Sequence, residues 1–283
     1  TLGIMIPPSG MLMIYGIIAG QDIGKLFIAG IVPGIVLSLM FIALIYGRVR
    51  LKPSLAPLGE KTNFRQKFLS IADSFEMIIL IIVVIGGLLI GWFTPTEAGA
   101  AGAVGALVLS LVRRRLNWAG LRDATLETIR TAGMIFTILM GALVFTTFLA
   151  LSTIPQEMAE WVGGLGLPRM GVMVLILVIY VVLGTFLEEM SMILLTLPIF
   201  LPLVSSLGFD LIWFGILNVL VVEMGMISPP VGITMFVVKG IAPDVPMGTI
   251  FKGVLPFWVA TIVFAGLLLA FPAIALTLPS LIG

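Results

Sequence analysis

The sequence has 283 residues, of which 60% are hydrophobic and 10% are charged, and its formal net charge is +1. A chain this apolar excludes a soluble globular protein and predicts an all-α polytopic membrane protein. Because cysteine and histidine are absent, disulfides, metal sites built on these side chains and acid–base catalysis by histidine are also excluded.

Membrane-spanning helices need apolar runs of about 20 residues. Four unbroken runs meet this requirement and a fifth is just long enough to cross; in chain order they are 26–47, 75–93, 97–112 (the short run), 133–152 and 250–271. Three further apolar blocks are interrupted. They are 1–20, with the step Pro7-Pro8; 172–204, with the letters GTFLEEMS; and 209–240, with the step Pro229-Pro230.

Basic residues orient these spans, since lysine and arginine concentrate in cytoplasmic loops. Six lie within 48–67, five lie within 113–130, and Lys239 and Lys252 flank a third loop. All three loops are predicted to be cytoplasmic, provided that 172–204 enters and leaves the membrane on one face. That block is therefore either a re-entrant hairpin or a pair of short helices, and the C-terminus is expected outside.

Three segments between the spans mix charged and apolar residues. Residues 53–73 and 116–131 are predicted to lie along the cytoplasmic interface, and 155–166 along the outer one. The alternative for all three is simple connecting loops.

The stretch WFTPTEAGAAGAVGA, residues 92–106, predicts the start of a helix. Thr94 is the expected N-cap, Pro95 the first helical residue and Glu97 the partner in a capping box. Small residues then recur at spacings that favour close helix packing, namely Gly99, Gly102, Ala103 and Ala106.

The two Pro-Pro steps belong to an internal repeat. At a constant offset, Gly3, Pro7, Pro8, Gly10, Met13 and Asp22 match Gly225, Pro229, Pro230, Gly232, Met235 and Asp244; after a one-residue shift, Gly30 and Pro33 match Gly253 and Pro256. The predicted orientation makes the two copies run in opposite directions across the membrane. Inverted repeats with broken helices are typical of secondary transporters, whose binding sites lie at the breaks.

Adjacent prolines remove two backbone donors, so the carbonyls before them lose their helical partners. Within a membrane such carbonyls must face protein or a polar cavity, where they suit a sodium ion. The half-helix that follows begins beside Ser9 in one copy and Thr234 in the other, and its N-terminal end favours an anion. The alternative is a proline kink without a ligand.

Three glutamates lie in or beside apolar blocks: Glu188, Glu189 and Glu223. A charged side chain at the bilayer centre costs about 2.5 to 3.5 kcal/mol, and no lysine or arginine occurs within 172–204 or 209–238. Their partner is therefore expected to be a bound cation, a proton or backbone N–H groups, although Glu189 could also lie at a wet hairpin mouth. A carboxylate substrate would be held by helix N-termini, hydroxyls and bound ions.

Four ordered motifs make the chain resemble the large membrane subunit (DctM-like) of tripartite ATP-independent periplasmic (TRAP) transporters: GIMIPPSG, FTPTEAGA, GTFLEEMSMILLTLPIFLPL and EMGMISPPVGITMFV. The resemblance implies an elevator-type carrier in a bacterial or archaeal cell membrane, related to divalent anion/sodium symporters. It implies no cofactor other than the coupling ion Na⁺, and no nucleic acid. The implied partners are a small membrane subunit, an extracytoplasmic binding protein and an organic acid, such as a C4-dicarboxylate, sialic acid or another sugar acid.

The resemblance also implies ion and substrate sites. One sodium site would use carbonyls around Gly3, Ile6 and Pro8, completed by a hairpin expected before Thr1. Its counterpart would use Thr185, Glu188, Ser191, Met224, Gly225, Ser228 and Pro230, and the substrate would contact Ser9, Gly10, Gly232 and Thr234. Two positions depart from the family pattern, which commonly has Asp at Glu188 and often Asn at Thr234.

By the same resemblance, a mobile transport domain would comprise 1–47 and 170–272, and a scaffold 75–169. An interfacial linker, 48–74, and an external tail, 273–283, would complete the chain. The alternatives are a stand-alone sodium/anion symporter without a binding protein, a non-transporting membrane scaffold and an intramembrane enzyme. The last is disfavoured because the chain has no HExxH motif and no paired aspartates in facing spans.

Overall fold

The structure is a computed structural model and describes residues 2–55, 75–152, 166–228 and 232–282, together with 154, 157, 160, 161 and 164. In this described part all regular secondary structure is helical, which confirms the all-α prediction. Five of the described helices are long and apolar enough to cross a membrane. The chain divides into two compact units, residues 1–46 with 135–283 and residues 47–134.

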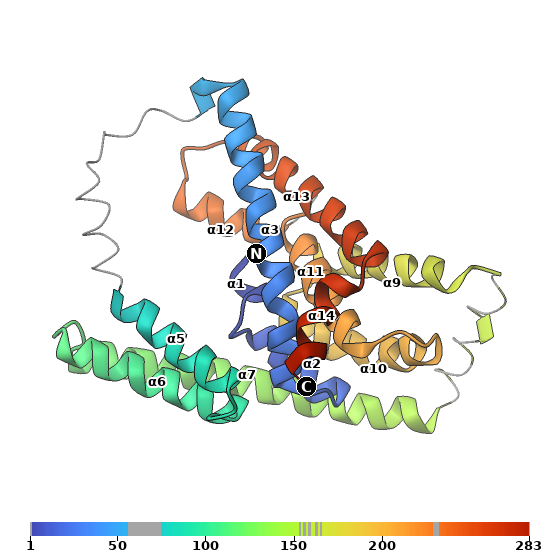
Figure 1. Cartoon of the computed structure of the whole chain (residues 1–283), viewed down its shortest axis with the longest axis horizontal. Coiled ribbons are helices and arrows are strands. Elements are labelled where there is room, and N and C mark those ends of the chain that lie inside the picture. The colour runs from blue at the N-terminus through green and yellow to red at the C-terminus, as the bar shows by residue number, and fades with distance from the viewer. Residues whose placement is uncertain are drawn as a thin grey trace. The chain divides into compact units, whose positions relative to one another are not determined.

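The first copy of the repeat is a short helix, a break, a second short helix and a long helix. These are α1 (Leu2–Met5), α2 (Gly10–Ala19) and α3 (Ile23–Leu51), as labelled in Figure 1. The break falls at the predicted Pro7-Pro8 step, whose peptide bond is cis. The long helix α3 contains the predicted span 26–47 and continues through Pro33.

The second copy repeats this order with α11 (Leu211–Met226), α12 (Ile233–Ile241) and α13 (Met247–Ala270). The interruption between α11 and α12 covers the second Pro-Pro step, although residues 229–231 lie outside the described part of the chain. Pro256 lies inside α13 as Pro33 lies inside α3. The sequence repeat is thus a repeat of structure.

The second half of the first broken helix, α2, packs antiparallel to the first half of the second broken helix, α11. The Tyr15 hydroxyl, in the second half of α2, donates a hydrogen bond to the carbonyl of Leu211 at the start of α11. Leu12, one turn earlier in α2, and Ile216, further along α11, both border Gly30. Residues nearer the C-terminal end of α2 therefore lie beside residues nearer the N-terminal end of α11. This antiparallel packing is what an inverted repeat requires.

The interrupted block 172–204 is a helical hairpin made of α9 (Arg169–Gly184) and α10 (Glu189–Ser206). With 16 and 18 residues, these helices are about 24 and 27 Å long at 1.5 Å per residue. Two helices joined by a short turn agree with both alternatives, so the choice between a re-entrant hairpin and paired short helices stays a prediction. The depth of the pair in the membrane stays a prediction.

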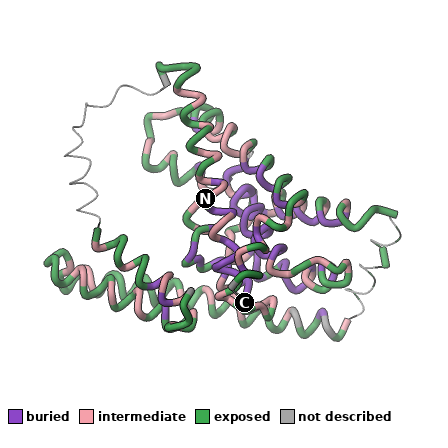
Figure 2. The backbone as a smooth tube through the Cα atoms, viewed as in Figure 1, coloured by how far each residue is buried: buried purple, intermediate pink, exposed green. Residues whose placement is uncertain are grey.

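The core of the larger unit is α11, in which every residue from Trp213 to Gly225 is buried. A helix with apolar residues around its whole circumference, interrupted only by Asn218 and Glu223, belongs in an interior. Figure 2 shows the buried positions gathered along α11 and the helices around it. The helices packed against it are α1, α2, α9, α10, α13 and α14 (Ala273–Ile282). The last residues, expected as a tail, therefore form a helix that covers the core.

The smaller unit contains a turn of 3-10 helix, η1 (Pro53–Leu55), and the packed pair α5 (Phe75–Leu89) and α6 (Pro95–Val112). The predicted capping box at the start of α6 is confirmed: Thr94 N–H donates to the Glu97 carboxylate at 2.8 Å, and Glu97 N–H donates to Thr94 Oγ1 at 3.3 Å.

The small residues of α6 pack differently from the prediction. Ala98 is buried, Gly102 approaches Val84 of α5, and a Cβ built on Gly105 would lie 2.3 Å from Leu80 Cδ1. These residues recur at i, i+4 and i+7, which places them on one face of the helix. A Cβ built on Gly99 would meet no described atom within 4 Å, so the close contact runs through Gly105 instead.

A single helix, α7 (Trp118–Leu151), replaces two segments that were predicted separately, 116–131 and 133–152. The expected boundary between them is wrong because the sequence from Trp118 to Leu151 contains no proline. Glycine inside a helix costs only about 1 kcal/mol, so Gly133 does not end it. Most of 53–73 and much of 155–166 lie outside the described residues. The assignment of transport domain, linker and scaffold stays a prediction.

Candidate functional site

The first break is held closely by α3. A Cβ built on Gly30 would lie 2.8 Å from the carbonyl oxygen of Met5, and one on Gly34 would lie 2.7 Å from Ile6 Cγ1. Only glycine permits this approach at both positions. Ser9 is 2% exposed and caps α2, accepting a hydrogen bond from Leu12 N–H at 3.2 Å. The break is thus packed against protein on its α3 side, as a membrane setting requires.

The other predicted residues of the first break lie at its surface. Gly3, Ile6, Pro8 and Gly10 are exposed within the described structure. This face of the break is therefore not covered by the described part of the chain.

The second break is anchored to α13. Ser228, which is 2% exposed, donates its hydroxyl to the carbonyl of Met224 at 2.8 Å and accepts a hydrogen bond from Trp258 Nε1. Ile227 and Met235, on either side of the break, pack in one cluster with Ile250 of α13. The hydroxyl of Ser228 is therefore fixed in position by two partners.

The return into α12 depends on Gly232. Its φ of 55° is left-handed, and a Cβ built on it would lie 3.0 Å from the Ser228 carbonyl oxygen and 3.2 Å from that of Met226. Both reasons favour glycine. Thr234 lies half-buried in the first turn of α12, and Pro230 lies outside the described residues.

The tip of the hairpin consists of residues 185–188. Thr185 is buried and donates its hydroxyl to the Val182 carbonyl at 2.7 Å. Glu188 is exposed and caps α10, since its Oε2 accepts hydrogen bonds from the N–H and hydroxyl of Ser191 at 3.0 and 3.2 Å. The Glu188 carboxylate therefore stabilises the start of α10 and also lies at the tip of the hairpin.

The hairpin tip meets the second break through a contact between glycines. A Cβ built on Gly225 would lie 2.7 Å from Gly184 Cα, so the backbones of α9 and α11 touch. At the other end of the same pair, the Arg169 guanidinium lies 5.6 Å from the ring centre of Phe209. The two helices thus run parallel and end together. The hairpin tip at Thr185 and the second break at Gly225 and Ser228, which are distant from each other in the sequence, therefore lie in one region.

The starts of α2 and α10 join the same region. A Cβ built on Gly10 would lie 3.7 Å from Met190 Cε, while the far end of α2, at Ile18 and Ala19, lines a pocket with Pro198 and Leu201 of α10. These helices are therefore also parallel and begin together.

Two C-terminal and two N-terminal helix ends thus meet in one region, at the hairpin tip and the breaks. The carbonyl ends of α9 and α11 favour a cation, and the N–H ends of α2 and α10 favour an anion. Glu189, at the start of α10, is near enough to Glu223 and to Glu188 to interact electrostatically with each. Chemically, the arrangement can hold a small cation and a carboxylate next to one another.

Sequence reasoning missed two features of this region. One is Trp258, which holds Ser228 from α13. The other is a buried polar cluster in which the hydroxyls of Tyr180 and Thr196 lie 2.8 Å apart, with Asn218 beside them. The sequence did carry a signal for Thr196 and Asn218, since each is a polar residue within an apolar run. Polar side chains in such positions need hydrogen-bond partners when they are buried.

Comparison with known proteins gives one family match. The family described as "Tripartite ATP-independent periplasmic transporter, DctM component" matches residues 1–274. The C4-dicarboxylate TRAP transporter large permease protein DctM of Pseudomonas aeruginosa is 34% identical over 284 residues, 100% of this chain and 66% of that protein. The sialic acid TRAP transporter large permease protein SiaM of Vibrio cholerae is 31% identical over 281 residues, 99% of this chain and 65% of that protein.

A third relative is longer. The isethionate TRAP transporter permease protein DctMQ of Oleidesulfovibrio alaskensis is 30% identical over 243 residues, 86% of this chain and 38% of that protein. The chain thus spans about two thirds of the length of the first two relatives and less of the third. All three names denote permease components of transporters, in agreement with the expectation that the chain is not an enzyme.

Proposed function

This chain belongs to the DctM component family of tripartite ATP-independent periplasmic transporters, and on that premise we propose that it forms the ion- and substrate-binding part of a sodium-coupled organic-acid importer. The resemblance predicted from four motifs is confirmed by the family match over residues 1–274. The membrane location follows from the same family and from the five apolar helices.

The single observation that supports the transport role is the convergence of helix ends around Gly184, Gly225 and Ser228. Such ends carry unsatisfied backbone groups, which are tolerated at membrane depth only where protein or a polar ligand meets them. Here carbonyl ends and N–H ends face one region together with buried hydroxyls. A non-transporting scaffold would gain nothing from two broken helices in inverted register.

Sodium coupling is the energy source that we propose. The family description reads "ATP-independent", so a solute accumulated by this carrier must draw on another gradient. The carbonyl end of α11, the Thr185 hydroxyl and the Ser228 hydroxyl supply hard oxygen ligands, which suit a hard alkali cation. The site would take up its ion and its anion together. It would then keep its internal geometry while it moves between the two faces of the membrane, as in an elevator mechanism.

The substrate class and partners are proposed from the relatives. The names of the relatives include C4-dicarboxylate, sialic acid and isethionate, all of them organic anions that the start of α2 would favour. The word "tripartite" and the longer relative named DctMQ favour a small membrane subunit and an extracytoplasmic binding protein as partners.

Uptake into proteoliposomes tests the transport proposal. We expect the full-length protein with its small subunit to import an organic acid only when the matching binding protein is added outside. The binding protein's ligand is found first by thermal shift, so the substrate is chosen before transport is measured. Uptake at full rate without the binding protein would instead support the stand-alone carrier. No uptake of any ligand bound by that protein would contradict transport.

The sodium site is tested by Ser228→Ala and Glu188→Ala. Each removes about 1 kcal/mol of hydrogen bonding that orders an end of the site. We therefore expect the sodium concentration for half-maximal uptake to rise by about threefold to tenfold. Uptake is measured as a function of sodium concentration, after size-exclusion chromatography shows that each variant inserts and assembles.

Ser206→Ala is the matched control for Ser228. The Ser206 hydroxyl also donates to a carbonyl of its own helix, that of Leu203 at 2.8 Å, but at the C-terminal end of α10, opposite to the end that joins the site. Its sodium dependence is expected to equal that of the unmodified protein. Unchanged sodium dependence in both site variants would move the ion site elsewhere.

A further inference from the structure

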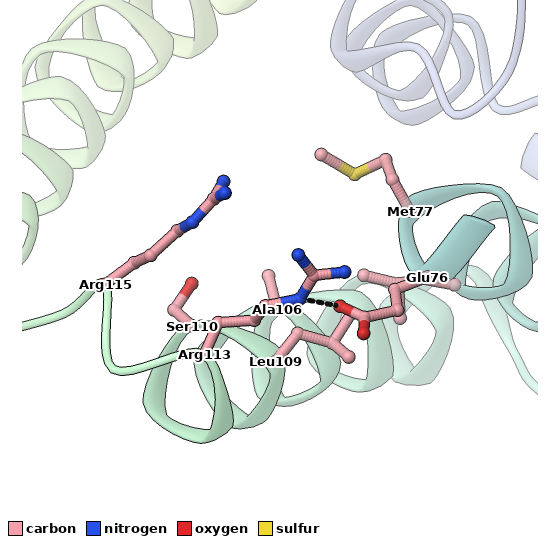
Figure 3. Close-up of a pocket in the computed structure, with 8 residues that line it drawn as sticks. Glu76, Met77, Ala106, Leu109, Ser110, Arg113 and Arg115 are labelled. Carbon is pink, nitrogen blue, oxygen red and sulfur yellow. Dashed lines mark hydrogen bonds and ion pairs between the residues drawn. The ribbon is translucent and has the colours of Figure 1, made fainter. Parts of the chain in front are cut away.

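A hollow that the transport proposal does not use lies in the unit formed by residues 47–134. It is a pocket of about 330 Å³ between the start of α5 and the end of α6. Two of its lining residues form an ion pair, in which Arg113 Nε donates to Glu76 Oε2 at 2.9 Å. Figure 3 shows the Ser110 side chain between those of Arg113 and Arg115. A hydroxyl and two guanidinium groups therefore line one side of the pocket.

The charges in this pocket are not balanced. Glu76 pairs with Arg113, whereas the side chain of Arg115 has no hydrogen bond or ion pair with the described part of the chain. The pocket therefore carries a net positive charge. Guanidinium groups and a hydroxyl are the donors that phosphate oxygens take best.

An apolar groove continues from the pocket along α5 and α6. It has a volume of about 340 Å³ and shares Glu76, Leu80 and Leu109 with the charged pocket. Its further walls are Ile79, Val83, Gly105 and Val108. Because Gly105 has no side chain, Leu80 can lie against α6 at this point. The groove offers almost no polar surface, so it suits a hydrocarbon chain.

We propose that this pocket and groove bind one anionic phospholipid, with its phosphate at Ser110, Arg113 and Arg115 and one acyl chain in the groove toward Val108. The charge pattern favours the cytoplasmic leaflet. The pocket lies where α5 follows the basic segment 48–67 in the sequence and α6 leads into the basic segment 113–130, and both segments are predicted to be cytoplasmic. Headgroup pockets with basic residues on this side of a membrane are suited to anionic lipids.

The charge and the groove together select a lipid over the other occupants. A free phosphate would use the arginines but not the apolar groove. An apolar helix of another protein would fill the groove but leave Arg115 facing hydrocarbon, which is costly. A lipid with a net negative headgroup satisfies both parts at once.

Binding of phosphatidylglycerol by the full-length protein, measured by native mass spectrometry in mild detergent, tests this proposal. We expect one molecule to be retained per chain, in preference to phosphatidylcholine. Arg115→Gln should weaken its binding about fivefold, which corresponds to about 1 kcal/mol. The matched control Arg114→Gln removes the same charge from the adjacent residue, which does not line the pocket, and should change binding by less than about twofold.

The acyl chain is tested separately from the headgroup. Val108→Trp fills the groove and should weaken phosphatidylglycerol binding, whereas Val104→Trp, on the same helix but outside the groove, should not. Glycerol 3-phosphate at millimolar concentration should not compete. Equal weakening by the two arginine variants, or competition by glycerol 3-phosphate, would overturn the proposal. Loss of binding when the small membrane subunit is present would also overturn it, because a protein would then cover the groove.

Discussion

Uptake of the organic acid by the full-length protein and its partners is expected to fall at least about tenfold when potassium replaces sodium. The proposed ligands are the carbonyl end of α11 and the hydroxyls of Thr185 and Ser228, which are few and lie on elements packed backbone to backbone at Gly184 and Gly225. Such a site cannot widen freely to take the larger ion. A difference of 1.4 kcal/mol in ion binding suffices for a tenfold effect.

The measurement needs the ion gradient and the membrane potential to be separated. Proteoliposomes are prepared with equal ionic strength on both sides, and valinomycin with fixed potassium sets the same potential in the sodium and the choline arms. Uptake that follows the sodium gradient at constant potential supports coupling. Uptake at full rate with potassium or choline alone would refute sodium coupling while leaving the family assignment intact.

Most of the fold was predictable because its main determinants are local. Adjacent prolines end a helix wherever they occur, so the break between Met5 and Gly10 could be placed from the sequence to within a few residues. The capping box at Thr94 and Glu97 is equally local. Pro33 and Pro256 match in the internal repeat, which indicated that the same order of helices occurs near both ends of the chain.

Helix boundaries without a proline were harder to predict. The charges of 116–131 suggested a segment separate from the apolar run 133–152, yet α7 continues through both. Charge changes the environment in which a helix is stable but does not interrupt its backbone hydrogen bonds. The helix α14 was missed for a related reason, because what stabilises it is packing against α11 and α13.

The site residues were predictable in type but not in position. A hydroxyl next to a break suggests a ligand, and the sequence does place Ser228 there. The tryptophan that holds it, Trp258, lies 30 residues away on another helix. Likewise, the contact between Gly184 and Gly225 depends on the parallel packing of α9 and α11, which no local pattern reveals. Ligand roles for these residues stay a prediction.

Gly225→Ala is expected to lower the stability of the protein by about 1 to 3 kcal/mol, as overpacking a well-packed interior does, and to reduce uptake at least about tenfold. The new Cβ would lie 2.7 Å from Gly184 Cα, 3.0 Å from its carbonyl carbon and 3.0 Å from the Val181 carbonyl oxygen. All three are backbone atoms, so relief requires α9 and α11 to move apart. That movement would separate Thr185 from the second break.

Thermal unfolding in detergent and uptake in proteoliposomes check this together, with Gly266→Ala as the matched control. Gly266 also lies inside a helix, α13, and a Cβ built there would meet no described atom within 4 Å. Because alanine favours a helix over glycine by about 1 kcal/mol, the control should unfold at an equal or higher temperature and transport normally. If Gly225→Ala behaved like this control, the hairpin tip and the second break would not need their close contact for transport.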